Sequence, residues 1–239
     1  MTTTSSAPSR IDPSTVIYRV CAAPFRVQTY KNLLYLLVAF PLGIAYFTWL
    51  VTGGSLGIGL LITWVGLPIL VLTLSGATVA AGIEAWLAES LVGVDASVPA
   101  FLSEFRVEDG LVLPGDGFVE AIKQLVTAPS TWTSVVLLVT KFAAGIVSFV
   151  AVVTSTAIAA ALLAAPFIYD DAAISVGAAN PAGASEYTIG SWTVSTLPEA
   201  LIVAGLGVFF VLVAVNLLNG LARVQALYTA RLLGVQDGD

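Results

Sequence analysis

The chain has 239 residues, of which 58% are hydrophobic and only 10% charged. This composition indicates a membrane protein, because soluble domains carry roughly 25% charged residues. Acidic residues outnumber basic ones 15 to 9 and give a net charge of −6, which argues against a nucleic-acid partner because such a partner needs a basic surface. The absence of histidine and the single cysteine, Cys21, exclude catalysis by histidine, an intrachain disulfide and a Cys/His metal site. We therefore expect no enzyme activity, no metal and no cofactor.

Residues 1–12 are small and polar and are expected to be disordered, whereas residues 13–94 are predicted to form one membrane unit. The unit begins with a short amphipathic helix that lies in the membrane interface or packs on the protein itself. The fifty residues from Leu33 to Gly82 carry no charge, which suffices for two crossings because a bilayer needs roughly 20 apolar residues per helix. We expect crossings at about 33–52 and 56–82, joined by a tight turn at residues 53–55, and then an amphipathic exit that contains Glu84.

A second unit, residues 118–235, follows a soluble connector at 95–117 and precedes a tail at 236–239. Its opening apolar pattern, at 118–126, repeats the pattern of the first interfacial helix 101 positions later. Further along, after one inserted residue, the correspondence continues as follows: Phe40, Gly43, Ile44 and Phe47 match Phe142, Gly145, Ile146 and Phe149, and Leu91-Val92-Gly93-Val94 matches Leu232-Leu233-Gly234-Val235. We therefore predict an internal duplication.

The second unit contains the remaining two crossings, expected at about 131–168 and 198–222. Lys141 is expected to snorkel to the cytoplasmic interface, and the alternative is a buried counter-ion for Glu84. Asn216 and Asn219, near the end of the last crossing, are expected to join helices by hydrogen bonds, with ligand coordination as the alternative.

The segment 169–197 between these crossings has two β-prone pieces separated by a Pro/Gly turn, which indicates a small hairpin-like loop. Its charged residues are all acidic. It either caps the bundle or forms a sensing surface for a cation, a cationic peptide or an envelope component. The candidate signal-receiving residues are Asp170, Asp171, Tyr187 and Trp192.

The basic residues predict the orientation. Eight of them precede the first crossing, lie between the second and third, or follow the fourth, and the loops at 53–55 and 169–197 have none. The positive-inside rule places both termini and the connector in the cytoplasm and the loop 169–197 outside. The predicted fold class is an all-α membrane protein with four transmembrane helices. They form two duplicated hairpins with interfacial amphipathic helices and a small external β-hairpin-like loop.

Several motifs carry a resemblance to a known family. They are Tyr35-Leu36-Leu37-x-x-x-Pro41-Leu42-Gly43, Gly66-Leu67-Pro68, the exit from Glu84 to Gly93, and Trp192-Thr193-Val194-x-x-Leu197-Pro198-Glu199-Ala200. Together, over residues 25–235, they resemble the putative sensor domain found alone in haloarchaea and at the N-terminus of some actinobacterial histidine kinases. The acidic, lysine-poor composition is also similar to that of haloarchaeal proteins.

The resemblance implies a sensor in the cell membrane. The sequence ends 16 residues after Arg223 with no output domain, so we expect the signal to pass to a separate protein partner such as a kinase, a regulator or a membrane-complex subunit. Two other functions stay open, namely an accessory subunit of a membrane complex and a small transporter or channel-type subunit. Transport usually places acidic residues inside the crossings, and Glu84 is expected at an end, which disfavours the transporter. Homo-oligomerisation also stays open.

Overall fold

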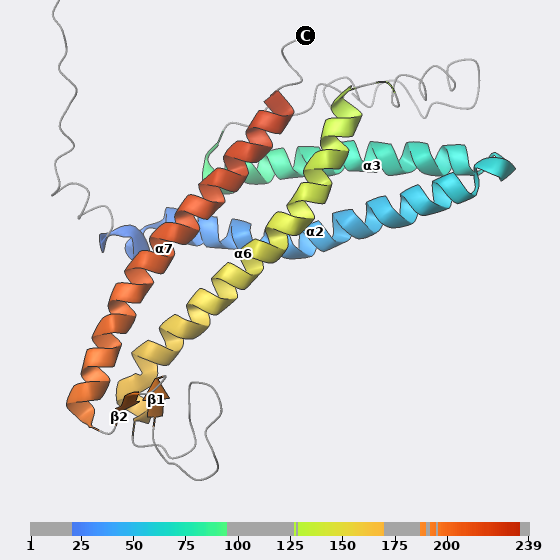
Figure 1. Ribbon diagram of the computed structural model, residues 1–239. Coiled ribbons are helices and arrows are strands. Elements are labelled where there is room, and N and C mark those ends of the chain that lie inside the picture. The colour runs from blue at the N-terminus through green and yellow to red at the C-terminus, as the bar shows by residue number, and fades with distance from the viewer. Residues whose placement is uncertain are drawn as a thin grey trace, which may run out of the picture. The chain divides into compact units, whose positions relative to one another are not determined.

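The computed structural model describes residues 21–94, 127, 129–169, 187–189, 192–194 and 196–234. Four long helices make up most of this part of the chain (Figure 1): α2 (Val27–Gly59), α3 (Gly66–Leu87), α6 (Pro129–Ile168) and α7 (Leu197–Gly234). The shorter helical elements are η1 (Ala23–Phe25), η2 (Leu61–Thr63) and the π-helical turn η3 (Ala88–Val92), which continues α3.

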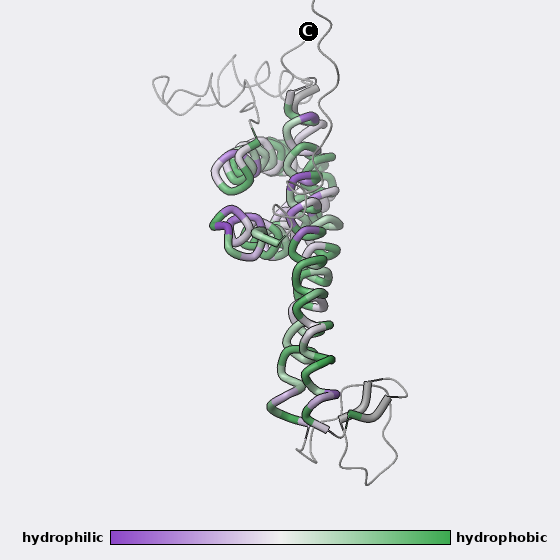
Figure 2. The backbone as a smooth tube through the Cα atoms, turned by 90° about the vertical axis from the view of Figure 1, so that its left-hand side faces the viewer, coloured by the Kyte–Doolittle hydropathy of each residue, from purple (hydrophilic) through white to green (hydrophobic). Residues whose placement is uncertain are grey.

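Each of the four helices is long and apolar enough to cross a membrane, and Figure 2 shows hydrophobic residues along much of α6 and α7, the two helices seen lengthwise in that view. The prediction of an all-α membrane protein with four transmembrane helices is therefore confirmed. The last predicted crossing and its exit form one continuous helix, α7. The predicted disordered start, the connector, the tail, the second interfacial helix and most of the first lie outside the described residues.

The turn between the first two crossings lies later than predicted. Helix α2 runs through residues 53–55, and the chain reverses at residues 60–65 around η2. A Cβ atom on Gly53 would collide with the side chain of Thr73 in α3. This glycine therefore serves the close approach of two helices rather than a turn, as small residues often do in membrane bundles. The prediction of a turn at 53–55 was wrong.

The chain divides into two compact units. The first unit includes, among the described residues, 21–29, α6 from Ser155 onward, the strands and α7 up to Leu217. The second unit contains α2 from Tyr30, α3, α6 up to Thr154 and α7 from Leu218. Since α6 and α7 are unbroken helices of 40 and 38 residues, each contributes to both units.

The first unit contains the predicted hairpin. Strands β1 (Tyr187–Ile189) and β2 (Trp192–Val194) pair antiparallel, with Thr188 opposite Thr193. Val194 is fully buried and packs in one cluster with Ala165 of α6 and Val203 of α7. The hairpin is thus anchored by its second strand to the adjoining ends of the two long helices.

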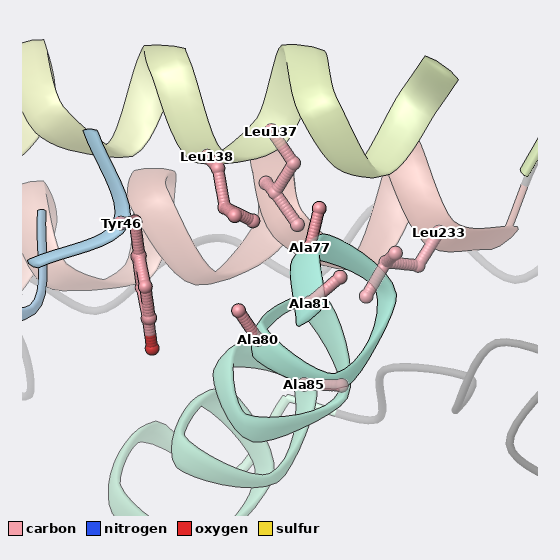
Figure 3. Packing of buried hydrophobic residues seen from close by; sticks show 8 residues of the cluster. All are labelled: Tyr46, Ala77, Ala80, Ala81, Ala85, Leu137, Leu138 and Leu233. Atoms are coloured by element: carbon pink, nitrogen blue, oxygen red, sulfur yellow. The ribbon is translucent and has the colours of Figure 1, made fainter. Parts of the chain in front are cut away.

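The second unit has two clusters of buried apolar residues. The α3–α6 cluster, drawn in Figure 3, consists of Tyr46, Ala77, Ala80, Ala81, Ala85, Leu137, Leu138 and Leu233. The α2–α7 cluster consists of Tyr35, Leu36, Ala88, Val92, Val152, Leu218, Ala222 and Ala226. Alanine is the commonest residue in both, and side chains of this size let helix backbones approach closely.

Helices α2 and α6 cross in the second unit at two glycines. A Cβ atom on Gly43 would lie 2.9 Å from the Cα of Phe142, and one on Gly145 would lie 2.6 Å from the carbonyl oxygen of Ala39. Phenylalanine rings stack on both sides of this crossing: Phe40 on Phe149, and Phe47 on Phe142, each pair with centroids 4.4 Å apart. The crossing brings polar side chains of α2 and α6 within reach of each other.

Candidate functional site

The most prominent polar feature of the second unit is a buried ion pair. Lys141 Nζ in α6 lies 2.6 Å from Glu84 Oε2 in α3, and both side chains are 2% exposed. Lys141 also donates a hydrogen bond of 2.5 Å to the hydroxyl of Tyr35 in α2 and lies 4.7 Å from the centroid of that ring. Charges in the hydrocarbon region are costly unless they are paired, and this arrangement pairs them while joining three helices.

Two sequence-based expectations are corrected here. Lys141 does not snorkel to an interface, because Glu84 and Tyr35 give its ammonium group partners inside the protein. Glu84 does not sit outside the crossing either, since it is buried within the candidate span Gly66–Val92. The alternative interpretation of Lys141, a buried counter-ion for Glu84, describes the structure.

A second hydroxyl borders the carboxylate of Glu84. Tyr46 of α2 is 8% exposed, and its hydroxyl interacts electrostatically with Glu84, although it makes no hydrogen bond of regular geometry among the described residues. The carboxylate therefore has one cation and one phenol as polar neighbours, from α6 and α2.

Neutral hydrogen bonds link α7 to the other helices of the second unit. Gln225 Nε2 donates to Ser148 Oγ at 2.5 Å and more weakly to the carbonyl oxygen of Ala144 at 3.4 Å, both in α6. Asn32 Nδ2 in α2 donates to Asn219 Oδ1 at 2.8 Å. Asn219 is thus placed for the helix-joining role, whereas Asn216 donates to the carbonyl oxygen of Leu212 in its own helix.

The candidate signal-receiving residues divide into two groups. Asp170 and Asp171 lie outside the described residues, whereas Tyr187 and Trp192 begin β1 and β2 and pair with Val194 and Ile189 respectively. Their role in receiving a signal stays a prediction. Among the described residues, no group of three or more Cys, Asp or Glu side chains could hold a metal ion.

Sequence reasoning missed five of the buried polar residues described above: Asn32, Tyr35, Tyr46, Ser148 and Gln225. One signal was present, because Lys141 and Ser148 are seven residues apart in an apolar run and so share one helix face. That face meets α2, α3 and α7 through the contacts described above. Polar positions spaced this way within a crossing identify the side of a helix that faces the protein interior.

Comparison with curated proteins found no match, and comparison with solved structures found none either. The model of a family described as Putative sensor matches residues 35–233. This range includes the helix crossing, the ion pair of Glu84 with Lys141, and the hydrogen bond of Gln225 with Ser148. Because the match covers well over half of the 239 residues, this chain belongs to the Putative sensor family.

Proposed function

We propose that this chain is a non-enzymatic membrane sensor that relays an envelope or extracellular signal to a separate partner protein. Its family and its four helices of membrane-spanning length support the proposal. The main observation in its support is that α6 and α7 are each one continuous helix. These two helices hold the β-hairpin at one end of their length and take part in the polar network toward the other.

The physical basis of the relay is a shift between two arrangements of these helices. A ligand can change the far end of a protein only by binding one of two arrangements more tightly. Val194 anchors the hairpin among Ala165, Ala200 and Val203, so a displacement of the hairpin acts directly on the ends of α6 and α7. An unbroken helix can transmit such a displacement along its axis, and residues 223–234 of α7 would then present it to the partner.

The proposed orientation has both termini in the cytoplasm and the hairpin outside. The positive-inside rule supports it, and the observed reversal at residues 60–65 contains no basic residue, like the turn expected at 53–55. The partners in this proposal are the lipid bilayer and one cytoplasmic or membrane protein, and no nucleic acid takes part.

The coupling can be tested without knowing the ligand. Spin labels at Val136→Cys in α6 and Leu227→Cys in α7, both exposed positions, report the separation of these helices in a Cys21→Ser background in lipid nanodiscs. We expect Val194→Asp, which places a charge in the hairpin anchor, to shift the distance distribution, whereas Thr196→Asp at an exposed neighbouring position should not. An unchanged distribution for a folded Val194→Asp protein would show that the hairpin only caps the bundle.

The sensing role itself needs a cellular test. Deletion of residues 172–190 removes most of the loop and leaves the four long helices intact. We expect this deletion to abolish changes in partner binding and in stress-dependent transcription. If both persist while the protein inserts at normal levels, an accessory role in a membrane complex replaces the sensor.

A transporter is the second candidate function, because the structure places Glu84 and Lys141 inside candidate spans. Such residues often mark ion pathways. Ion or proton flux in proteoliposomes separates the two functions. The sensor proposal expects the same flux as empty liposomes, and a flux abolished by Glu84→Gln would favour transport instead.

A further inference from the structure

Contacts between α2 and α6 occur in reciprocal pairs. The sequence correspondence relates residues of α2 up to Val38 to those 101 positions later in α6, and residues from Phe40 onward to those 102 positions later. Between them, the glycine contacts pair Ala39 with Lys141. Under this correspondence, the stack of Phe40 on Phe149 maps onto the stack of Phe47 on Phe142. The glycines follow the same rule: Gly145 approaches Ala39 and Phe40, while Gly43 approaches the corresponding residues, Lys141 and Phe142. A local two-fold axis through the crossing would produce this reciprocity.

The two apolar clusters show the same relation. Residues of α3 correspond to residues of α7 that are 141 positions later. Ala77, Ala81 and Ala85 of the α3–α6 cluster thus correspond to Leu218, Ala222 and Ala226 of the α2–α7 cluster. In the same way, Leu137 and Leu233 of the α3–α6 cluster correspond to Leu36 and Val92 of the α2–α7 cluster. Each hairpin therefore packs its second helix on the first helix of the other hairpin.

The polar residues follow the same relation with one exception. Glu84 corresponds to Gln225, and Tyr46 corresponds to Ser148. Glu84 interacts electrostatically with Tyr46, and Gln225 donates a hydrogen bond to Ser148, so polar side chains meet at corresponding positions of the two halves. Lys141, however, is equivalent to Ala39 in the glycine contacts, and therefore only one of the two halves has a cation beside its polar group among the described residues.

The difference gives the two interfaces unequal strength. The α3–α6 interface contains the ion pair Glu84–Lys141, and separating it would leave two charges in a region of low polarity. The α2–α7 interface contains the neutral hydrogen bond of Asn32 to Asn219, and such bonds between membrane helices are weak.

We propose that the second unit has two equivalent halves related by a local two-fold axis, one formed by α2 and α3 and the other by the parts of α6 and α7 in this unit. In this arrangement the ion pair locks α3 to α6, and the neutral α2–α7 interface is the one that opens. Only the use of this opening in signalling rests on the proposed function. The two-fold relation and the unequal strength of the interfaces are tested without any signal or partner. A negative result in these tests is therefore distinguishable from a negative result for the sensor proposal.

The first test is hydrogen exchange of the unmodified protein in lipid nanodiscs, which needs no variant to fold. Backbone amides of residues 218–229 in α7 should exchange faster than those of residues 77–88 in α3, by about tenfold or more, since the ion pair holds only the latter. Equal rates, or faster exchange in α3, would overturn the proposed lock.

The second test rebuilds the ion pair in the other half. Gln225→Glu and Ala39→Lys should each lower the melting temperature, by roughly 6 °C or more, because each buries an unpaired charge. Together they should recover at least half of the larger loss and slow the exchange of α7. The matched control combines Gln225→Glu with Ala45→Lys, an exposed position of α2, and should recover nothing. A double variant no more stable than Gln225→Glu alone would refute the equivalence of the two halves.

Discussion

Removing Lys141 from the buried ion pair should destabilise the protein more than removing both Lys141 and Glu84. In Lys141→Met, the Glu84 carboxylate stays buried, and among the described residues it keeps the phenol of Tyr46 as a polar neighbour. Breaking a buried pair in this way costs about 3–5 kcal/mol. Glu84→Gln should cost less, about 1–3 kcal/mol, because Lys141 keeps its hydrogen bond and cation–π contact with Tyr35.

The double variant provides the decisive comparison. With Lys141→Met in place, the further change Glu84→Gln removes the unpaired charge and should restore about 2 kcal/mol, leaving mainly the cost of the unpartnered Tyr35 hydroxyl. For a chain of this size, 1 kcal/mol corresponds to roughly 2–4 °C in melting temperature. Thermal unfolding in detergent micelles, followed by circular dichroism, should therefore show a drop of about 6–20 °C for Lys141→Met and a partial recovery of several degrees for the double variant.

Matched controls come from exposed residues of the same types. Lys31→Met and Glu89→Gln change exposed side chains and should stay within about 0.5 kcal/mol of the unmodified protein. The reasoning fails if Glu84→Gln lowers the stability of the Lys141→Met protein further, because the two residues would then contribute independently rather than as a pair.

Three further predictions follow from other features. Gly145→Val should cost about 1–3 kcal/mol by overpacking the crossing with α2, whereas Gly220→Ala, with no atom near its added Cβ, should be neutral or stabilising in the same thermal assay. In intact cells with a Cys21→Ser background, a membrane-impermeant thiol reagent should label Ser185→Cys but not Ser103→Cys, and the reverse pattern would invert the topology. Protein purified without a metal-binding tag should hydrolyse no ATP and carry no stoichiometric transition metal by elemental analysis.

The transmembrane helices could be predicted because the bilayer imposes a length and an apolar composition on each crossing. These requirements apply to every position of an apolar run, so misinterpreting a single residue does not change the predicted crossing. The hairpin of β1 and β2 was similarly visible from local β-propensity around a turn. The reversal at residues 60–65 could not be predicted, because glycines in a membrane protein indicate close helix packing as often as turns. Which of the two a glycine serves depends on the residues that face it in the fold.

The environment of Lys141 could not be decided from the sequence for a related reason. A lysine in an apolar run can extend to the interface or find a partner, and the partner here, Tyr35, is 106 positions away. Snorkelling needs no tertiary partner, so the sequence favours it over the alternative pairing with Glu84. What distinguishes the two is the Gly43–Gly145 crossing, which brings α2 against α6 and buries Lys141.

The ion pair also limits which movements a relay through this bundle can use. A buried pair contributes little net stability compared with apolar residues, but separating its members is costly. Any arrangement in which α3 leaves α6 would separate the opposite charges of Glu84 and Lys141 in a region of low polarity. An arrangement in which α7 shifts past α2 breaks neutral hydrogen bonds, such as that of Asn32 to Asn219, and apolar contacts that small residues can exchange for others, but it separates no ion pair of the described residues. In the proposed relay we therefore expect movements that keep the pair intact, and we expect α7, which continues from the hairpin, to be the helix that makes them.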